Sequence, residues 1–175
     1  MENQTKGKCK YCGKEYTRAY MLRHLDSCKK RKERIAAETG TKKCGYFELV
    51  ISGKYEKEYW LVIEIGENVT LKDLDSFLRD IWVECCGHLS TFNIYGVSYT
   101  VEPAVSSMWG QTDKSMNYKL KSVLEKGMSI GYRNSYAMNA IRKQPPLSAR
   151  NVCMKGVDCY VATAGKPMNA GKRCS

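Results

Sequence analysis

The sequence predicts an α+β fold in which antiparallel hairpins pack against helices, preceded by a small metal-binding module with an extended basic helix. Three observations lead to this fold class. Four Cys and His residues stand at metal-ligand spacing near the start, two apolar runs read as paired strands (residues 45–51 and 59–65), and one segment has helical apolar spacing (residues 70–82). The 175 residues suffice for one ordinary domain and a small additional module.

We expect the chain to divide into three parts. Residues 1–43 would hold the metal-binding module and its basic helix, residues 44–144 the α+β domain, and residues 145–175 a basic tail that contains cysteines. Pro145-Pro146 marks a stiff break before this tail. Because apolar periodicity is weak beyond it, two interpretations stay open: a disordered basic segment, or a folded segment whose cysteines join a metal site.

The first module contains Cys9, Cys12, His24 and Cys28, spaced Cys-x2-Cys-x11-His-x3-Cys. A Cys-x2-Cys knuckle places two thiolates on one side of a tight turn, and a His and a Cys four residues apart share one face of a helix. Four such ligands form a tetrahedral zinc site with no open position, which is the arrangement of a structural site. The sequence therefore predicts zinc as a structural cofactor.

The segment after the knuckle reads as one long helix. Thr17 can cap its start, and no Gly or Pro interrupts it before Gly40, where Thr39-Gly40-Thr41 would end it. Tyr16 and Met21 stand where a ββα finger keeps its small core. About 20 residues here resemble the Cys-Cys-His-Cys zinc fingers. A module of this size buries little apolar surface, so metal binding should supply most of its folding free energy.

The positive charge belongs to the two ends of the chain. The net charge is +11; residues 1–43 hold 13 Lys and Arg against 5 acidic residues, residues 44–150 hold 12 against 12, and residues 151–175 hold 4 against 1. A basic module beside a neutral domain favours contact with a polyanion. A solvated basic helix face that serves solubility is the plainer interpretation, and it stays open.

In ββα fingers the start of the helix reads the major groove, where Thr17, Tyr20 and Arg23 would project here. Basic side chains on the knuckle and helix would add phosphate contacts. The candidate nucleic-acid-binding residues are Lys14, Arg18, Tyr20, Arg23, Lys29, Lys30, Arg31, Lys32 and Arg34. Single fingers also serve as protein-interaction modules, so a protein partner stays open, as does DNA against RNA.

Several elements are expected in the central part. The strands at residues 45–51 and 59–65 should pair in antiparallel fashion. Thr70 with Asp73 gives a capping-box start to a helix whose apolar face is Leu71, Leu74, Leu78, Ile81 and Trp82. Further expectations are strands at residues 91–95 and 97–101 turning near Gly96, a loop at 102–112, a helix at 118–125 ended by Gly127, and a strand at 128–132.

Residues 44–135 resemble the Ri-plasmid ORF-three-like family, whose members are also described as TnpR passenger proteins of insertion elements. The resemblance rests on Thr70-Leu71-Lys72-Asp73-Leu74-Asp75, on Phe77-Leu78-Arg79-Asp80-Ile81-Trp82 and on His88-Leu89-Ser90-Thr91-Phe92. It implies an α+β fold, a bacterial or archaeal cytoplasm and carriage on mobile elements. It implies no reaction, because the family has no defined biochemical role.

One family motif differs in this chain. Where the family has Y-x-YDFG, the chain reads Tyr132-Arg133-Asn134-Ser135-Tyr136-Ala137. Ser135 replaces the acidic residue and Ala137 replaces the glycine, so a role that the family gives to this carboxylate does not carry over.

A second cluster of thiols and imidazole comprises Cys85, Cys86 and His88. These residues are a possible second metal site, with a fourth ligand from Cys44 or from Cys153, Cys159 or Cys174 of the tail. Core packing is the plainer interpretation, since free cysteine is a common core residue. A third interpretation is that one of these cysteines is a reactive thiol.

No enzyme motif is present: the sequence lacks a Walker loop, a dinucleotide-binding glycine turn, His-Glu-x-x-His and G-x-S-x-G. The polar start has no signal-peptide core, and no apolar run could span a bilayer, so a cytoplasmic location is expected. We therefore expect a non-catalytic, zinc-binding accessory protein that contacts nucleic acid, or alternatively a protein-interaction adaptor, with no membrane or small-molecule partner.

Overall fold

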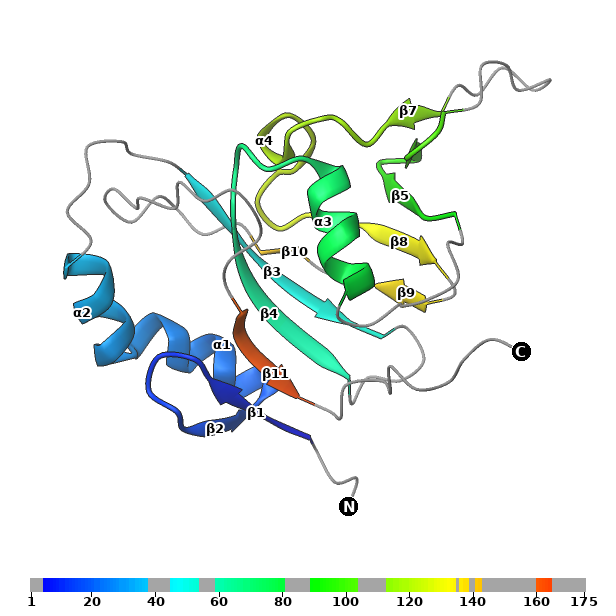
Figure 1. The fold of residues 1–175 in the computed structure, drawn as a ribbon. Helices are drawn as coiled ribbons and strands as arrows, with labels where there is room; N and C mark the ends of the chain where they lie inside the picture. Colours follow the sequence, from blue (N-terminus) through cyan, green and yellow to red (C-terminus); the bar gives the residue numbers. More distant parts are fainter. Residues whose placement is uncertain are drawn as a thin grey trace.

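In a computed structural model, the chain is built around one antiparallel strand pair, β3 (Tyr46–Ser52) and β4 (Trp60–Gly66) (Figure 1). Both predicted strands are confirmed, shifted by one residue. Every residue of the two strands is buried. Since successive side chains point to opposite faces of a strand, both faces of this pair must be covered. The structure describes residues 5–37, 45–53, 59–80, 89–103, 113–134, 136–138, 141–142 and 160–164.

The first face of the β3–β4 pair carries the larger apolar core. Phe47 and Leu49 of β3 and Ile63 of β4 pack there with α3 (Leu71–Leu78) and with a five-stranded sheet. Figure 1 shows α3 and this second sheet together on one side of β3 and β4, with α1 and α2 on the other side. The mixture of helices and antiparallel sheets confirms the predicted α+β class.

Helix α3 begins as its sequence predicts. The Thr70 hydroxyl accepts a hydrogen bond from the Asp73 backbone N–H at 3.2 Å, and the Asp73 carboxylate accepts one from the Thr70 backbone N–H at 3.0 Å. This reciprocal pair satisfies two donors that a helix start otherwise leaves without partners. The predicted apolar face is buried at Leu71, Leu74 and Leu78; its continuation at Ile81 and Trp82, and the predicted helix end at Gly87, lie outside the described residues.

The five-stranded sheet has the order β7-β6-β5-β8-β9. Its strands are β5 (Thr91–Ile94), β6 (Val97–Thr100), β7 (Lys114–Ser115), β8 (Gly131–Asn134) and β9 (Tyr136–Met138). β5 and β6 form the predicted hairpin. Its two turn residues, Tyr95 and Gly96, have φ of 49° and 78°. A two-residue turn of this hand needs left-handed backbone at both positions, which glycine adopts readily.

Two predicted elements of this part are shorter in the structure. The strand expected at 128–132 begins at Gly131, where pairing with β5 starts, and Met128 and Ile130 before it are buried in the apolar core. The helix expected at 118–125 is reduced to α4 (Leu120–Val123), since the backbone is extended at both flanks, with ψ of 144° at Lys119 and 139° at Leu124. Most of the loop expected at 102–112 lies outside the described residues.

The second face of the β3–β4 pair is covered by residues 5–37, here named the N-terminal unit. Its elements are β1 (Lys6–Cys9), β2 (Glu15–Thr17), α1 (Arg18–Ser27) and α2 (Lys29–Ala37). Met21 and Leu25 of α1 pack against Val50, Trp60 and Val62 in a second apolar cluster. The unit is therefore packed on the sheet.

The main sheet contains strands from all three expected parts of the chain. Its order is β10-β3-β4-β11-β1-β2. β11 (Tyr160–Ala164) pairs with β4 on one side and with β1 on the other, and β10 (Ile141–Arg142) pairs with β3. The expected boundaries at 43/44 and 144/145 lie outside the described residues. Residues 160–164 form a strand, so a fully disordered tail does not describe this part of the chain.

The prediction of one continuous helix after Thr17 is wrong. α1 ends at Ser27 and α2 starts at Lys29, because Cys28 between them has extended backbone, with φ −63° and ψ 111°. The Ser27 hydroxyl donates back to the carbonyl of His24 at 3.1 Å, which helps to close α1. The predicted helix end at Thr39-Gly40-Thr41 lies outside the described residues. No helix within the described ranges is long and apolar enough to cross a membrane.

Replacing Thr70 by Ala should lower the free energy of unfolding by about 1 kcal/mol, since it removes one half of the capping box. Urea denaturation of the variant beside Lys72→Ala, an exposed position of the same helix, measures the effect. A loss no greater than that of Lys72→Ala would contradict the role given to the cap.

Candidate metal centre

The β1–β2 turn brings the first two candidate ligands together. The Cys9 carbonyl accepts a hydrogen bond from the Gly13 backbone N–H at 2.8 Å, and the Cys9 N–H donates to the Lys14 carbonyl at 2.8 Å. Gly13 has φ of +74°, a conformation that an L side chain rarely adopts. This tight turn therefore depends on glycine, and it folds the chain so that Cys9 and Cys12 meet.

Helix α1 and its end supply the other two ligands. The His24 ring stacks on Tyr16, with ring centroids 4.1 Å apart and an interplanar angle of 20°. Met21 and Leu25 anchor the buried side of the helix, which confirms the predicted core role of Met21. Cys28 follows at the helix break. Thr17 stands at the N-cap position but makes no side-chain capping bond.

The four predicted ligands converge. The Sγ atoms of Cys9, Cys12 and Cys28 and a ring nitrogen of His24 all lie within 4.8 Å of one another. Cys12 Sγ and His24 Nε2 are 3.2 Å apart. A tetrahedron with metal–sulfur bonds of about 2.3 Å has edges of about 3.8 Å, so this spacing fits one ion at the centre. The three thiols are free, and the cluster could bind a metal ion.

The surroundings of the cluster shift the pKa values of its donor groups in different directions. Burial raises the pKa of the Cys9 thiol to about 11. Burial also acts upward on the pKa of Cys12, but hydrogen bonds with the Lys14 backbone and with the Cys9 and Cys28 side chains outweigh it and bring that pKa below its ordinary value. Burial and the nearby Lys14 charge lower the pKa of His24. A neutral imidazole with a free lone pair is the form that binds a metal.

Arg31 is not on the exposed basic face where the sequence placed it. Its side chain is buried, with 2% of the residue exposed, and it lies between Glu48 of β3 and Glu64 of β4. Its Nε donates to Glu64 at 2.9 Å, and its Nη2 contacts both Glu64 and, at 3.3 Å, Glu48. A guanidinium held in this way cannot reach a phosphate, so Arg31 leaves the set of nucleic-acid-binding candidates.

Glu48 and Glu64 face each other across the two strands and point toward the N-terminal unit. The Tyr11 hydroxyl, from the knuckle, also donates to Glu64 at 2.6 Å. Burial alone would lower the pKa of Arg31, but the charges of Glu64 and Glu48 hold it above its ordinary value. Arg31 thus stays cationic, as a buried guanidinium beside acidic side chains should.

Sequence reasoning missed this cluster, although a signal for it was present. Glu64 was not among the predicted site residues, and it lies inside β4, flanked by Ile63 and Ile65. Glu48 likewise interrupts the apolar run of β3. An acidic residue inside a fully buried strand needs a cation or several hydrogen-bond donors. The lysines and arginines of the basic helix could have been considered as that cation.

The other candidate nucleic-acid-binding residues stay at the surface. Tyr20 is 60% exposed, and the Arg23 guanidinium lies over its ring, 4.5 Å from the centroid. The exposed basic candidates on the knuckle, α1 and α2 are Lys14, Arg18, Arg23, Lys29, Lys30, Lys32 and Arg34. Nothing in the geometry brings a ligand to them, so their role stays a prediction.

The other residues that the sequence singled out either form contacts within the fold or lie outside the described residues. Tyr132, at the start of the late family motif, donates to the buried Asp75 carboxylate at 2.5 Å, and Arg79 joins Asp75 to Ser90. This closed network ties α3 to the five-stranded sheet. The possible second metal ligands Cys85, Cys86 and His88, and the tail cysteines, lie outside the described residues, as does Ser135.

Comparison with protein-family models, with curated proteins and with solved structures finds no match for this chain. The resemblance to the Ri-plasmid ORF-three-like family stays a prediction. The chemistry of the Cys and His cluster, and the charge on the surface around it, are therefore what a functional proposal must rest on.

Metal affinity should rise at least tenfold between pH 7 and pH 8. The Cys9 thiol, with its pKa near 11, keeps its proton at both pH values, so each bound metal must displace at least that proton. Competition titrations with a chromophoric chelator at a series of pH values measure the slope. An affinity that does not change with pH would show that Cys9 is not a ligand.

Proposed function

We propose that the chain is a zinc-binding, nucleic-acid-associated accessory protein, in which the N-terminal unit is a structural zinc finger. Its inner face packs on the sheet, and its outer face contacts the phosphates of DNA or RNA. The observation that carries the proposal is the separation of the two faces of the unit: Met21 and Leu25 are fully buried, whereas the basic side chains around them are exposed.

The donor set supports zinc. Three cysteine sulfurs and one imidazole are soft and borderline ligands, which favour zinc over magnesium or calcium, since these prefer oxygen. All four positions of a tetrahedron are supplied by the protein, and Cys9 and Cys28 are buried. A site with all four positions filled by the protein has no place for a substrate, so the metal would stabilise the fold and take no part in catalysis.

The distribution of charge supports a polyanion partner. Residues 44–150 are neutral overall, whereas the N-terminal unit remains strongly basic after Arg31 is paired internally. Lys6 and Lys8 of β1 are also exposed and extend the basic surface beyond the predicted residues. Clustered lysine and arginine on one module is the electrostatic pattern of phosphate-backbone binding.

The adaptor alternative receives less support. The apolar side chains of α1 and the knuckle are used within the chain, in the cluster with Val50, Trp60 and Val62. Within residues 5–37, the large apolar side chain that stands exposed is Tyr20, already stacked with Arg23. A specific protein interface would need more apolar area than this. The link to plasmids and mobile elements rests on the family resemblance alone and is part of the proposal.

The purified protein should contain zinc that is lost on replacement of one ligand. Elemental analysis of the wild type and Cys12→Ser should differ by one zinc per chain, because three remaining donors do not close the site. Ser76→Ala, at an exposed position of α3 away from the four ligands, should leave the zinc content unchanged. Equal zinc in the wild type and Cys12→Ser would refute the assignment.

The double substitution Lys29→Glu/Lys30→Glu should weaken binding to a labelled 30-nucleotide probe, single-stranded or duplex. The plot of log affinity against log salt concentration should also become less steep, its slope falling by about 1 for each duplex phosphate that the variant no longer neutralises. Fluorescence anisotropy over a salt series measures both quantities.

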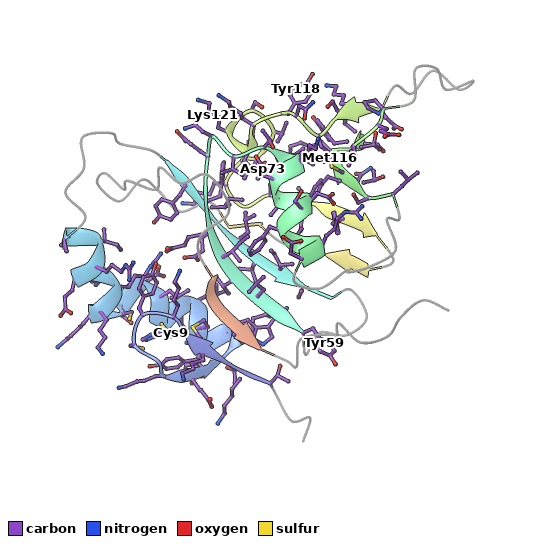
Figure 2. All side chains as sticks on the ribbon, in the orientation of Figure 1. Cys9, Tyr59, Asp73, Met116, Tyr118 and Lys121 are labelled. Carbon is purple, nitrogen blue, oxygen red and sulfur yellow. The ribbon has the colours of Figure 1, made fainter. Side chains whose placement is uncertain are left out.

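Lys119→Glu/Lys121→Glu is the matched control for charge. Both lysines are exposed at α4, and Figure 2 shows Lys121 far from Cys9. Equal weakening by the control would mean that the N-terminal unit has no special part in binding. Absence of binding at low salt by the wild type would overturn the nucleic-acid proposal and leave the adaptor alternative.

A further inference from the structure

The N-terminal unit contacts Glu64 from both sides of the metal cluster. Tyr11 lies between the ligands Cys9 and Cys12, and its hydroxyl donates to Glu64 at 2.6 Å. Arg31 lies three residues after the ligand Cys28 and donates to the same carboxyl group from Nε at 2.9 Å. A metal ion bound by all four ligands would join the two segments that carry these contacts.

The position of Arg31 depends on the helix break at Cys28. Its Nη1 donates to the Leu25 carbonyl at 2.7 Å, which ties the guanidinium to the end of α1. The Lys32 backbone N–H donates to the Cys28 carbonyl at 3.0 Å, so the first turn of α2 starts from the ligand itself. Without metal, this turn would be held against α1 by the backbone, by the Arg31–Leu25 hydrogen bond and by the packing of Cys28, and it would lose the bond from Cys28 to the metal.

Two of the ligands are also part of the packed interface. Cys9 and Cys28 belong to the apolar cluster with Met21, Leu25, Val50, Trp60 and Val62. The larger cluster on the first face of the β3–β4 pair contains no residue of the N-terminal unit. Metal release should therefore loosen the second face while the first face keeps its core.

We propose that bound metal controls access to the second face of the β3–β4 pair. In the metal-bound protein the chain's own N-terminal unit covers this face. Metal release frees the knuckle and the start of α2, withdraws Arg31 from Glu48 and Glu64, and uncovers Trp60. The face then carries two opposed acidic side chains, which stay solvated until Arg31 returns with the metal-bound unit. The exposure of this face would then depend on the concentration of free metal.

Thermodynamic linkage requires the reverse effect as well. If the metal stabilises docking, then contacts made on docking must strengthen metal binding by the same factor. Glu48 and Glu64 are not ligands and lie outside the N-terminal unit, yet they should influence metal affinity. A finger that is merely tethered to the domain would show no such dependence.

Metal affinity in the full-length protein tests this linkage. Arg31→Met should weaken zinc binding at least tenfold in competition titrations, whereas Lys30→Met, at the exposed neighbouring position, should stay within twofold of the wild type. Arg31→Met/Glu48→Gln/Glu64→Gln should recover at least threefold, because without the acidic groups the sheet no longer needs a cation. An Arg31→Met affinity within twofold of the wild type, or a triple variant as weak as Arg31→Met, would overturn the proposal.

A second measurement needs no change at the interface. Trp82→Phe/Trp109→Phe leaves Trp60 as the one tryptophan, and Trp60 is 1% exposed in the docked structure. A chelator should shift its emission to longer wavelength and raise acrylamide quenching severalfold, and added zinc should reverse both changes. Trp60 that stays shielded after metal removal would overturn the proposal. Both measurements rest on the proposed zinc binding, which elemental analysis tests separately. Neither involves nucleic acid, so their failure is distinct from failure of the proposed nucleic-acid contact.

Discussion

The structure depends on how two acidic side chains are neutralised inside a sheet. Glu48 and Glu64 face each other across β3 and β4 and are almost fully buried. Arg31 supplies the cation from one segment of the N-terminal unit and Tyr11 a hydroxyl donor from another. Removing one partner of a buried ion pair costs about 3–5 kcal/mol, a large part of a typical domain's stability. A bare second face is therefore costly, and in the docked structure the N-terminal unit is part of the fold.

This constraint explains how so small a unit could combine its structural role with the surface role proposed for it. The Cys and His cluster brings its hairpin to its helix, and the cluster with Val50, Trp60 and Val62 holds both to the sheet. β1 also extends the main sheet through β11. With one side anchored, the exposed lysines and arginines of α1 and α2 are presented on a fixed support. A rigid basic surface loses less entropy on contact with a phosphate backbone than a tethered one.

Local patterns predicted local structure well. The spacing of Cys9, Cys12, His24 and Cys28 predicted that these side chains cluster. Thr70 with Asp73 predicted the capping box of α3, and Gly96 predicted the β5–β6 turn. Contacts between distant segments were not predictable in this way. The pairing of β11 with β1 and β4 joins residues about 150 and 100 positions apart, and weak periodicity gave no sign of it. Arg31 looked like its exposed neighbours because a run of lysines and arginines conceals which side chain faces inward.

The claim that the N-terminal unit docks through Arg31 is tested most directly by a double-mutant cycle on the free energy of unfolding. The cycle compares Arg31→Met, Glu64→Gln and the double variant in the metal-loaded protein, with Lys30→Met and Glu64→Gln as the control pair. Side chains in direct buried contact should show a coupling free energy of about 2–3 kcal/mol, against a value near zero for the control. A coupling near zero for Arg31 and Glu64 would contradict the docked arrangement and return the unit to a module independent of the sheet.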